Sequence, residues 1–194
     1  MEEKLSVSGY LYSLRFYILF VSVIFICSIV LGYMGFLSDV FSEPLEWIQQ
    51  LSENIKESTQ QYPLWIVFLA FFIVIFFNNA FTCFLDIILG PLIGIFPMFS
   101  AFINGGLLGW FAQEEGLMVF FMIVPHGIFE LPAFLLSVAI GLRLGREVFK
   151  RKTERHLKKE LKRGLVVFLV LILPLLLIAA LIESVLIVAT LFLF

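Results

Sequence analysis

Two ionisable residues, His126 and Glu130, stand four positions apart within an apolar run of the sequence. Four residues make about one helical turn, so the two side chains would share one face of a helix. An imidazole and a carboxylate placed in this way can share a hydrogen bond, pass a proton or provide two ligands to a metal ion. The spacing therefore predicts a polar site on this face and leaves these three chemistries open.

Prolines flank this pair. Pro125 has no backbone N–H and suits the first turn of a helix, so the run has a natural place to break into two halves. A helix that begins there would direct free N–H groups and positive potential at the surroundings of His126. Pro132 removes the backbone hydrogen bond to the carbonyl of Ile128. We take Pro125, Gly127 and Pro132 as the candidate positions of a helix break.

Further polar side chains interrupt the other apolar runs. An ionisable group in hydrocarbon costs about 2.5–3.5 kcal/mol on insertion scales, so it normally faces the interior of a helix bundle and finds a partner there. Two ionisable residues outside the pair are Glu183, in the last apolar run, and Arg143, near the expected membrane interface. We predict an intramembrane polar core that consists of His126, Glu130, Asn78, Asn79, Asp86 and Asn104.

Three explanations fit such a core. The polar groups can join helices, each interhelical hydrogen bond contributing about 0.6 kcal/mol. They can also line a proton or solute pathway, or form the site of a metal-dependent intramembrane enzyme. The enzyme is less favoured because the apolar runs contain one histidine and no HExxH, GxSxG or paired-aspartate pattern. The only cofactor that the residues allow is a metal ion at His126 and Glu130, and zinc would need Asp86 or Glu183 as a further ligand.

The elements that position these residues must be membrane helices. Hydrophobic residues make up 61% of the 194 positions, with a mean hydropathy of +1.06, whereas a soluble domain has roughly 45–50%. A spanning helix needs about 20 mostly apolar residues. We predict one all-α membrane domain, residues 1–194, a polytopic transmembrane helix bundle with broken or kinked helices in its middle region. The five expected spans are 15–36, 63–89, 92–112, 117–142 and 165–194, the last being long enough for one kinked helix or a hairpin of two short halves.

Two charged segments connect the spans. In the acidic segment 37–62, apolar residues recur at helical spacing, which predicts an amphipathic helix on the outer membrane surface. The basic segment 143–164 holds ten of the thirteen Lys and Arg residues, and Glu147–Arg151 and Glu154–Lys158 are favourable i,i+4 pairs for a helix. Because Lys and Arg near membrane ends are retained in the cytoplasm, this segment and the N-terminus are expected inside. The sequence thus predicts a multi-pass cell-membrane protein whose C-terminus is outside if the last run crosses once.

The partners follow from the same pattern. We expect membrane lipids around the bundle, a homodimer through the glycine-rich third span, and a protein partner on segment 37–62. Nucleic acid is not expected, because the basic segment is held between two spans. The cysteines Cys27 and Cys83 have neither disulfide nor metal-site spacing and are expected to fill space in the core.

Several short stretches of the sequence resemble one protein family. PHGIFELPA at 125–133, continued by GLRLG at 141–145, resembles the hallmark of the stage II sporulation protein M (SpoIIM-like) family. The asparagines 78–79, GIFP at 94–97 and the Asn-Gly pair at 104–105 are similar to the family's middle region. The resemblance implies a multi-pass protein with a cytoplasmic N-terminus. In spore-forming bacteria it implies a membrane anchor or organiser in a complex that remodels peptidoglycan during engulfment, with hydrolases as partners.

Residues and resemblance together favour a non-enzymatic membrane scaffold or complex component. Two alternatives stay open at this point. One is a transporter or channel-like protein with a polar His/Glu/Asn/Asp site in the membrane, and the other is a metal-dependent intramembrane enzyme.

Overall fold

A computed structural model describes residues 7–36, 38 and 62–193, and all the regular structure in these residues is helical. Its elements are α1 (Val7–Tyr33), α3 (Leu64–Ile88), α4 (Ile95–Glu115), α5 (Val119–Phe149), α6 (Leu157–Val167), the π-helical turn η1 (Phe168–Ile172) and α7 (Leu173–Leu193). Five helical runs are long and apolar enough to cross a membrane. The predicted all-α bundle is confirmed. The amphipathic helix expected in 37–62 lies outside the described residues.

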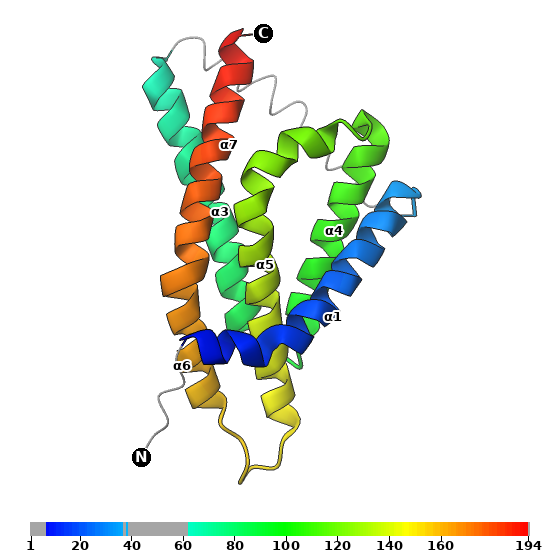
Figure 1. Ribbon diagram of the computed structural model, residues 1–194, viewed down its shortest axis with the longest axis vertical. Helices are drawn as coiled ribbons and strands as arrows, with labels where there is room; N and C mark the ends of the chain where they lie inside the picture. Colours follow the sequence, from blue (N-terminus) through cyan, green and yellow to red (C-terminus); the bar gives the residue numbers. More distant parts are fainter. Residues whose placement is uncertain (1–6, 37, 39–61, 194) are drawn as a thin grey trace.

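The five runs alternate in direction (Figure 1). The start of α1, the α3–α4 turn and the α5–α6 turn lie at one end of the bundle, while the ends of α1, α4 and α7 lie at the other. α1 packs most extensively on α4, α7 packs on both α3 and α5, and α5 touches every other helix. In the apolar 18-residue stretch of α5, 44% of the residues are buried, whereas in that of α3 only 11% are. α5 is therefore the central helix and α3 a peripheral one.

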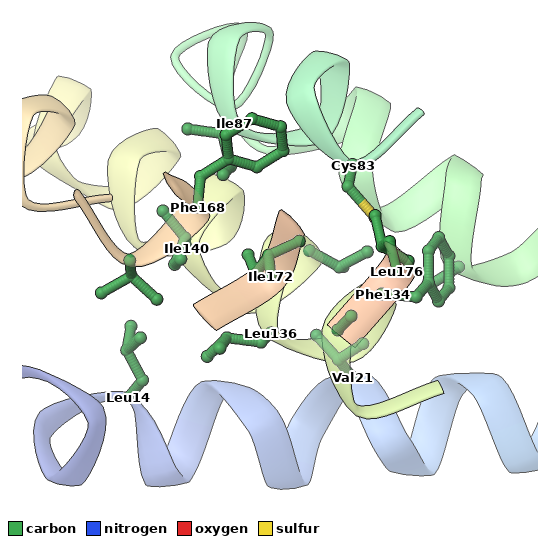
Figure 2. Packing of buried hydrophobic residues seen from close by; sticks show 14 of the residues in the cluster. Leu14, Val21, Cys83, Ile87, Phe134, Leu136, Ile140, Phe168, Ile172 and Leu176 are labelled. Atoms are coloured by element: carbon green, nitrogen blue, oxygen red, sulfur yellow. The ribbon is translucent and has the colours of Figure 1, made fainter. Parts of the chain in front are cut away.

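The apolar core follows the inner faces of these helices. Figure 2 shows Leu14 of α1, Ile140 of α5 and Ile172 of η1 in this core, and all three are fully buried. Lipid tails are as apolar as these side chains, so their burial does not by itself drive helices together in a membrane. Close packing and dispersion contacts hold the helices instead.

Glycines let α1 and α4 approach backbone to backbone. A Cβ added at Gly109 would overlap the carbonyl of Ile29, and one added at Gly32 would overlap the carbonyl of Gly106. Gly105 is covered by α1 in the same way, with the carbonyl of Phe25 at 2.6 Å from an added Cβ. The glycine-rich face of the third span is therefore covered by α1 of the same chain, and the homodimer stays a prediction.

A second glycine contact joins α5 to the α3–α4 turn. An added Cβ at Gly141 would overlap the carbonyl of Asp86, and one at Gly145 would lie 2.5 Å from the backbone nitrogen of Gly94. The turn itself reverses through left-handed backbone, with φ of 62° at Ile93 and 70° at Gly94. The GLRLG stretch at 141–145 thus has a packing reason, since larger residues would push α5 away from this turn.

Helix α5 is continuous from Val119 to Phe149 and contains both prolines. The division into two half-helices considered at Pro125 is therefore not formed, and no helix begins beside His126. Figure 1 shows instead that α5 curves strongly in its N-terminal half, as expected where a proline ring displaces the carbonyl four residues earlier. Gly127 does not break the helix either, and a Cβ added there has ordinary contacts, the nearest at 3.4 Å.

The last apolar run is one helical path from Leu157 to Leu193, not a hairpin. Its irregular point is η1, where the Leu173 N–H bonds to the carbonyl of Phe168, five residues back. Pro174 lies just beyond, has no N–H to donate, and its ring would clash with a carbonyl four residues earlier. The wider π turn accommodates that ring and lets the helix continue.

Candidate functional site

A cavity of about 530 Å³ lies among the inner faces of α3, α4, α5 and α7. Its polar lining comes from four helices and includes Asn78, Asn79 and Thr82 of α3, Asn104 of α4, His126 and Glu130 of α5, and Glu183 of α7. Most of the other lining residues are apolar, among them Phe25, Phe134 and Leu176. The structure thus brings five of the six predicted core residues to one cavity and adds Glu183 to them.

Within the cavity, three side chains form an acid–histidine cluster: His126, Glu130 and Glu183. One ligand atom from each lies within 4.8 Å of those of the other two. The i,i+4 spacing on α5 places the first two on one face, and the antiparallel α7 brings the third across from it. The Nδ1 atom of His126 is buried and has no hydrogen-bond partner among the described residues.

The cluster contains more acidic than basic side chains. The carboxyl groups of Glu130 and Glu183 each offer an oxygen within 4.8 Å of the other and of an imidazole nitrogen of His126, so the two carboxylates repel each other when both are ionised. The residues that line the cavity include no Lys or Arg. The site can therefore accept a cation or a hydrogen-bond donor more readily than an anion.

The three asparagines contribute amide groups to the wall of the cavity. Asn78 donates to the Asn79 side chain at 3.4 Å, and Asn104 donates to the carbonyl of Ser100 at 2.8 Å. These hydrogen bonds stay within their own helices. Their remaining donors and acceptors are available to a bound molecule.

Asp86 lies apart from the cavity. Its side chain is fully buried between α3 and α5, where the Ser137 hydroxyl donates to Oδ2 at 3.0 Å. Two carboxylates could complete a ligand set with His126. Of these, Glu183 lies beside His126 and Asp86 does not. Sequence reasoning identified both as membrane-embedded acids, but the spacing along the chain could not rank them.

A second polar cluster joins α1, α5 and α6 at the end of the bundle that carries the basic residues. Glu160 is 5% exposed and accepts ion pairs from Arg143 at 2.6 Å and Arg163 at 3.0 Å. Arg143 also lies over the Tyr10 ring and hydrogen bonds to Ser13. The sequence marked Arg143 as an interfacial cation but gave no means of assigning Glu160 as its partner.

The basic segment does not form one helix. Glu147 pairs with Lys150 and accepts the backbone N–H of His156 at 3.2 Å. Arg155 donates to carbonyls in and just after the last turn of α5 and so caps that helix. Because α5 ends just before Lys150, the expected pair Glu147–Arg151 is not formed, and the chain reverses here instead.

Fold and site together define a polytopic membrane protein in which five helical runs surround a polar cavity. A comparison with protein families narrows the assignment of the chain to one family. The family model of Stage II sporulation protein M matches residues 18–186. The chain belongs to this family, and the matched region includes the cavity residues. The chain is also 33% identical over 134 residues to an uncharacterised protein of Methanocaldococcus jannaschii, a match that covers 64% of this chain and 57% of the relative. No solved structure matches the chain.

Proposed function

We propose that this SpoIIM-family protein is a non-enzymatic component of a membrane complex that binds an acidic protein partner at its cytoplasmic end. The observation that carries the proposal is the basic hairpin, residues 143–163, formed by the end of α5, the reversing turn and the start of α6. Figure 1 shows this hairpin projecting beyond the ends of the other helices.

The outer surface of the basic hairpin is strongly positive. Seven of its Lys and Arg side chains are exposed, against one exposed glutamate, Glu154. The seven are Arg146, Arg151, Lys152, Arg155, Lys158, Lys159 and Lys162. The other two glutamates of the hairpin are buried and already paired, Glu147 with Lys150 and Glu160 with Arg143 and Arg163. The remaining positive charge is therefore left for a partner.

The same buried pairs fix the shape of the hairpin. Glu147 ties the turn to the end of α5 through the N–H of His156, and Glu160 joins α6 to α5 through Arg143. A surface that is ordered before binding loses less conformational entropy when a partner docks. Charge complementarity then favours an acidic partner and speeds its association.

Family membership supports a place in a cell-envelope complex. The family description names a sporulation protein, and the resemblance implies partners that remodel peptidoglycan. In this proposal the basic hairpin and the N-terminal end of α1 are cytoplasmic, as the excess of Lys and Arg indicates. The segment 37–62 is then outside, where we propose it as a second partner surface.

Site-specific photocrosslinking in the native membrane tests the proposal. A crosslinking amino acid at Lys158, Lys159 or Lys162 should capture the same protein, whereas one at Ile73, an exposed apolar position on α3, should capture lipid. With the crosslinking amino acid at Lys158, substituting Lys159 and Lys162 by glutamine should weaken the protein adduct. If all three hairpin positions gave lipid adducts and no protein adduct, the proposal of a protein partner at the basic hairpin would be refuted.

Reconstitution separates this proposal from transport and catalysis. A scaffold should give no ion or pH-dependent flux above that of empty liposomes. Flux that is present in the wild type and lost in Glu130→Gln would show that the protein is a transporter and not a scaffold. Glu130 is suited to this test because it lines the cavity and lies far from the basic hairpin along α5.

A further inference from the structure

The geometry points to a divalent transition-metal site, most simply for Zn²⁺, in which His126, Glu130 and Glu183 bind one ion and cross-link α5 to α7. In this inference the ion joins two helices, and no reaction is assigned to it. The inference does not depend on the partner proposed for the basic hairpin, because the two sites share no residue.

The donor set fits such an ion. Three ligand atoms, one imidazole nitrogen and two carboxylate oxygens, lie within 4.8 Å of one another. Ligands at about 2.0–2.2 Å from a tetrahedral Zn²⁺ lie about 3.4 Å apart, so small side-chain adjustments suffice. Imidazole with carboxylate suits Zn²⁺, Mn²⁺ or Fe²⁺, whereas Ca²⁺ and Mg²⁺ prefer oxygen ligands throughout.

Two further observations point to a ligand at this place. The Nδ1 atom of His126 is buried without a hydrogen-bond partner among the described residues, and an unpaired buried polar atom is destabilising. The cluster also faces a cavity of about 530 Å³, which leaves room for the ion and for water as its remaining ligand. A three-residue set with one open position is a common arrangement for Zn²⁺.

Charge compensation supports the same conclusion. Two carboxylates, Glu130 and Glu183, lie close together between membrane helices, and no Lys or Arg lines the cavity to neutralise them. Like charges in a medium of low dielectric constant repel strongly, and burial increases the cost of each. A divalent cation neutralises both and holds the curved half of α5 against α7.

Metal binding by the purified full-length protein tests the inference. The chain carries an affinity tag other than polyhistidine, is stripped with EDTA in detergent, and is titrated with Co²⁺ while visible absorption is recorded, then with Zn²⁺ as competitor. We expect one ion per chain and a Co²⁺ spectrum typical of four-coordinate nitrogen and oxygen ligation. A stoichiometry well below one, measured by elemental analysis, refutes the site.

Matched variants assign the ligands. His126→Asn, Glu130→Gln and Glu183→Gln should each weaken Zn²⁺ binding by more than about 100-fold, a larger loss than that of a residue which only orients a ligand. His156→Asn and Glu114→Gln change the same residue types at exposed positions outside the cavity and should bind as the wild type does. Equal affinity in all five variants contradicts the assignment.

A spectroscopic measurement on the wild type covers the case in which a cavity variant does not fold. X-ray absorption of the Zn²⁺-loaded protein should show one imidazole among nitrogen and oxygen ligands at about 2.0–2.2 Å. A spectrum without imidazole scattering overturns the inference. The Zn²⁺-loaded wild type should also unfold at a higher temperature than the stripped protein, a shift that His126→Asn should lack.

Discussion

Asp86 shows how a single acidic residue can serve helix packing within a membrane bundle. Its carboxyl group is fully buried and accepts the Ser137 hydroxyl at 3.0 Å. It also lies where the backbone of α3 meets Gly141 of α5. The residue therefore helps to fix the position of α5 against α3, while the acids of the cavity face open space.

Removing the hydroxyl that serves this acid tests its packing role. Ser137→Ala leaves the buried carboxyl group without its donor, so the free energy of unfolding should fall by about 1–3 kcal/mol. The measurement is equilibrium unfolding in detergent micelles with increasing SDS. Ser22→Ala, at a half-buried position of α1, is the control and should change stability by less than about 0.5 kcal/mol. Equal losses in the two variants would show that the hydrogen bond contributes nothing.

Among the helices, glycine has two different roles that the sequence alone does not separate. Gly109 of α4 faces the Ile29 carbonyl of α1 so closely that a methyl group would overlap it. Gly127 of α5 stands beside the functional site, yet a methyl group there has only ordinary contacts. The first glycine is required by helix–helix distance, whereas the second has no steric requirement.

The same substitution at these two glycines should have opposite effects. Gly109→Ala should lower the free energy of unfolding by about 1–3 kcal/mol, because α1 and α4 must move apart. Gly127→Ala should leave it unchanged or raise it by up to about 1 kcal/mol, because alanine favours the helix more than glycine does. SDS unfolding with EDTA present keeps any bound metal out of the comparison. If Gly109→Ala is as stable as Gly127→Ala, α1 and α4 do not pack at the distance described.

For the whole molecule, five crossings place the basic hairpin and the end of α4 on opposite sides of the membrane (Figure 1). Under the positive-inside rule we propose that the hairpin is the cytoplasmic side. The same arrangement puts the C-terminal end of α7 on the side of α4's end, because α6, η1 and α7 form one path. Orientation and the number of crossings can therefore be tested together.

Cysteine labelling in intact cells makes that test. With Glu115→Cys, at the exposed C-terminal end of α4, a membrane-impermeant maleimide should label the protein from outside. With Lys152→Cys, in the basic hairpin, labelling should require permeabilised cells. The wild type, whose Cys27 and Cys83 lie within apolar helices, provides the baseline. The reverse pattern would invert the proposed orientation, and labelling of both positions from outside would exclude the single crossing by α5 between them.

The sequence by itself determined the class of fold, the expected spans and five of the six polar residues that now line one cavity. This information is local. Continuous apolar runs require membrane helices, because backbone groups inside a bilayer must hydrogen bond to one another. The i,i+4 spacing places His126 and Glu130 on one helix face. The positions of Lys and Arg likewise predict orientation without any knowledge of packing.

Tertiary structure decided what depends on contacts between distant segments. It placed Glu183 and not Asp86 beside His126, because α7 brings Glu183 to that part of α5 whereas Asp86 lies against Ser137. It also showed that α1 packs on the glycines of α4, and that α5 curves at its prolines and does not break there. A helix that packs on its neighbours can bend where a backbone hydrogen bond is missing and still continue. The residue pattern within one helix does not show which neighbouring helix it contacts.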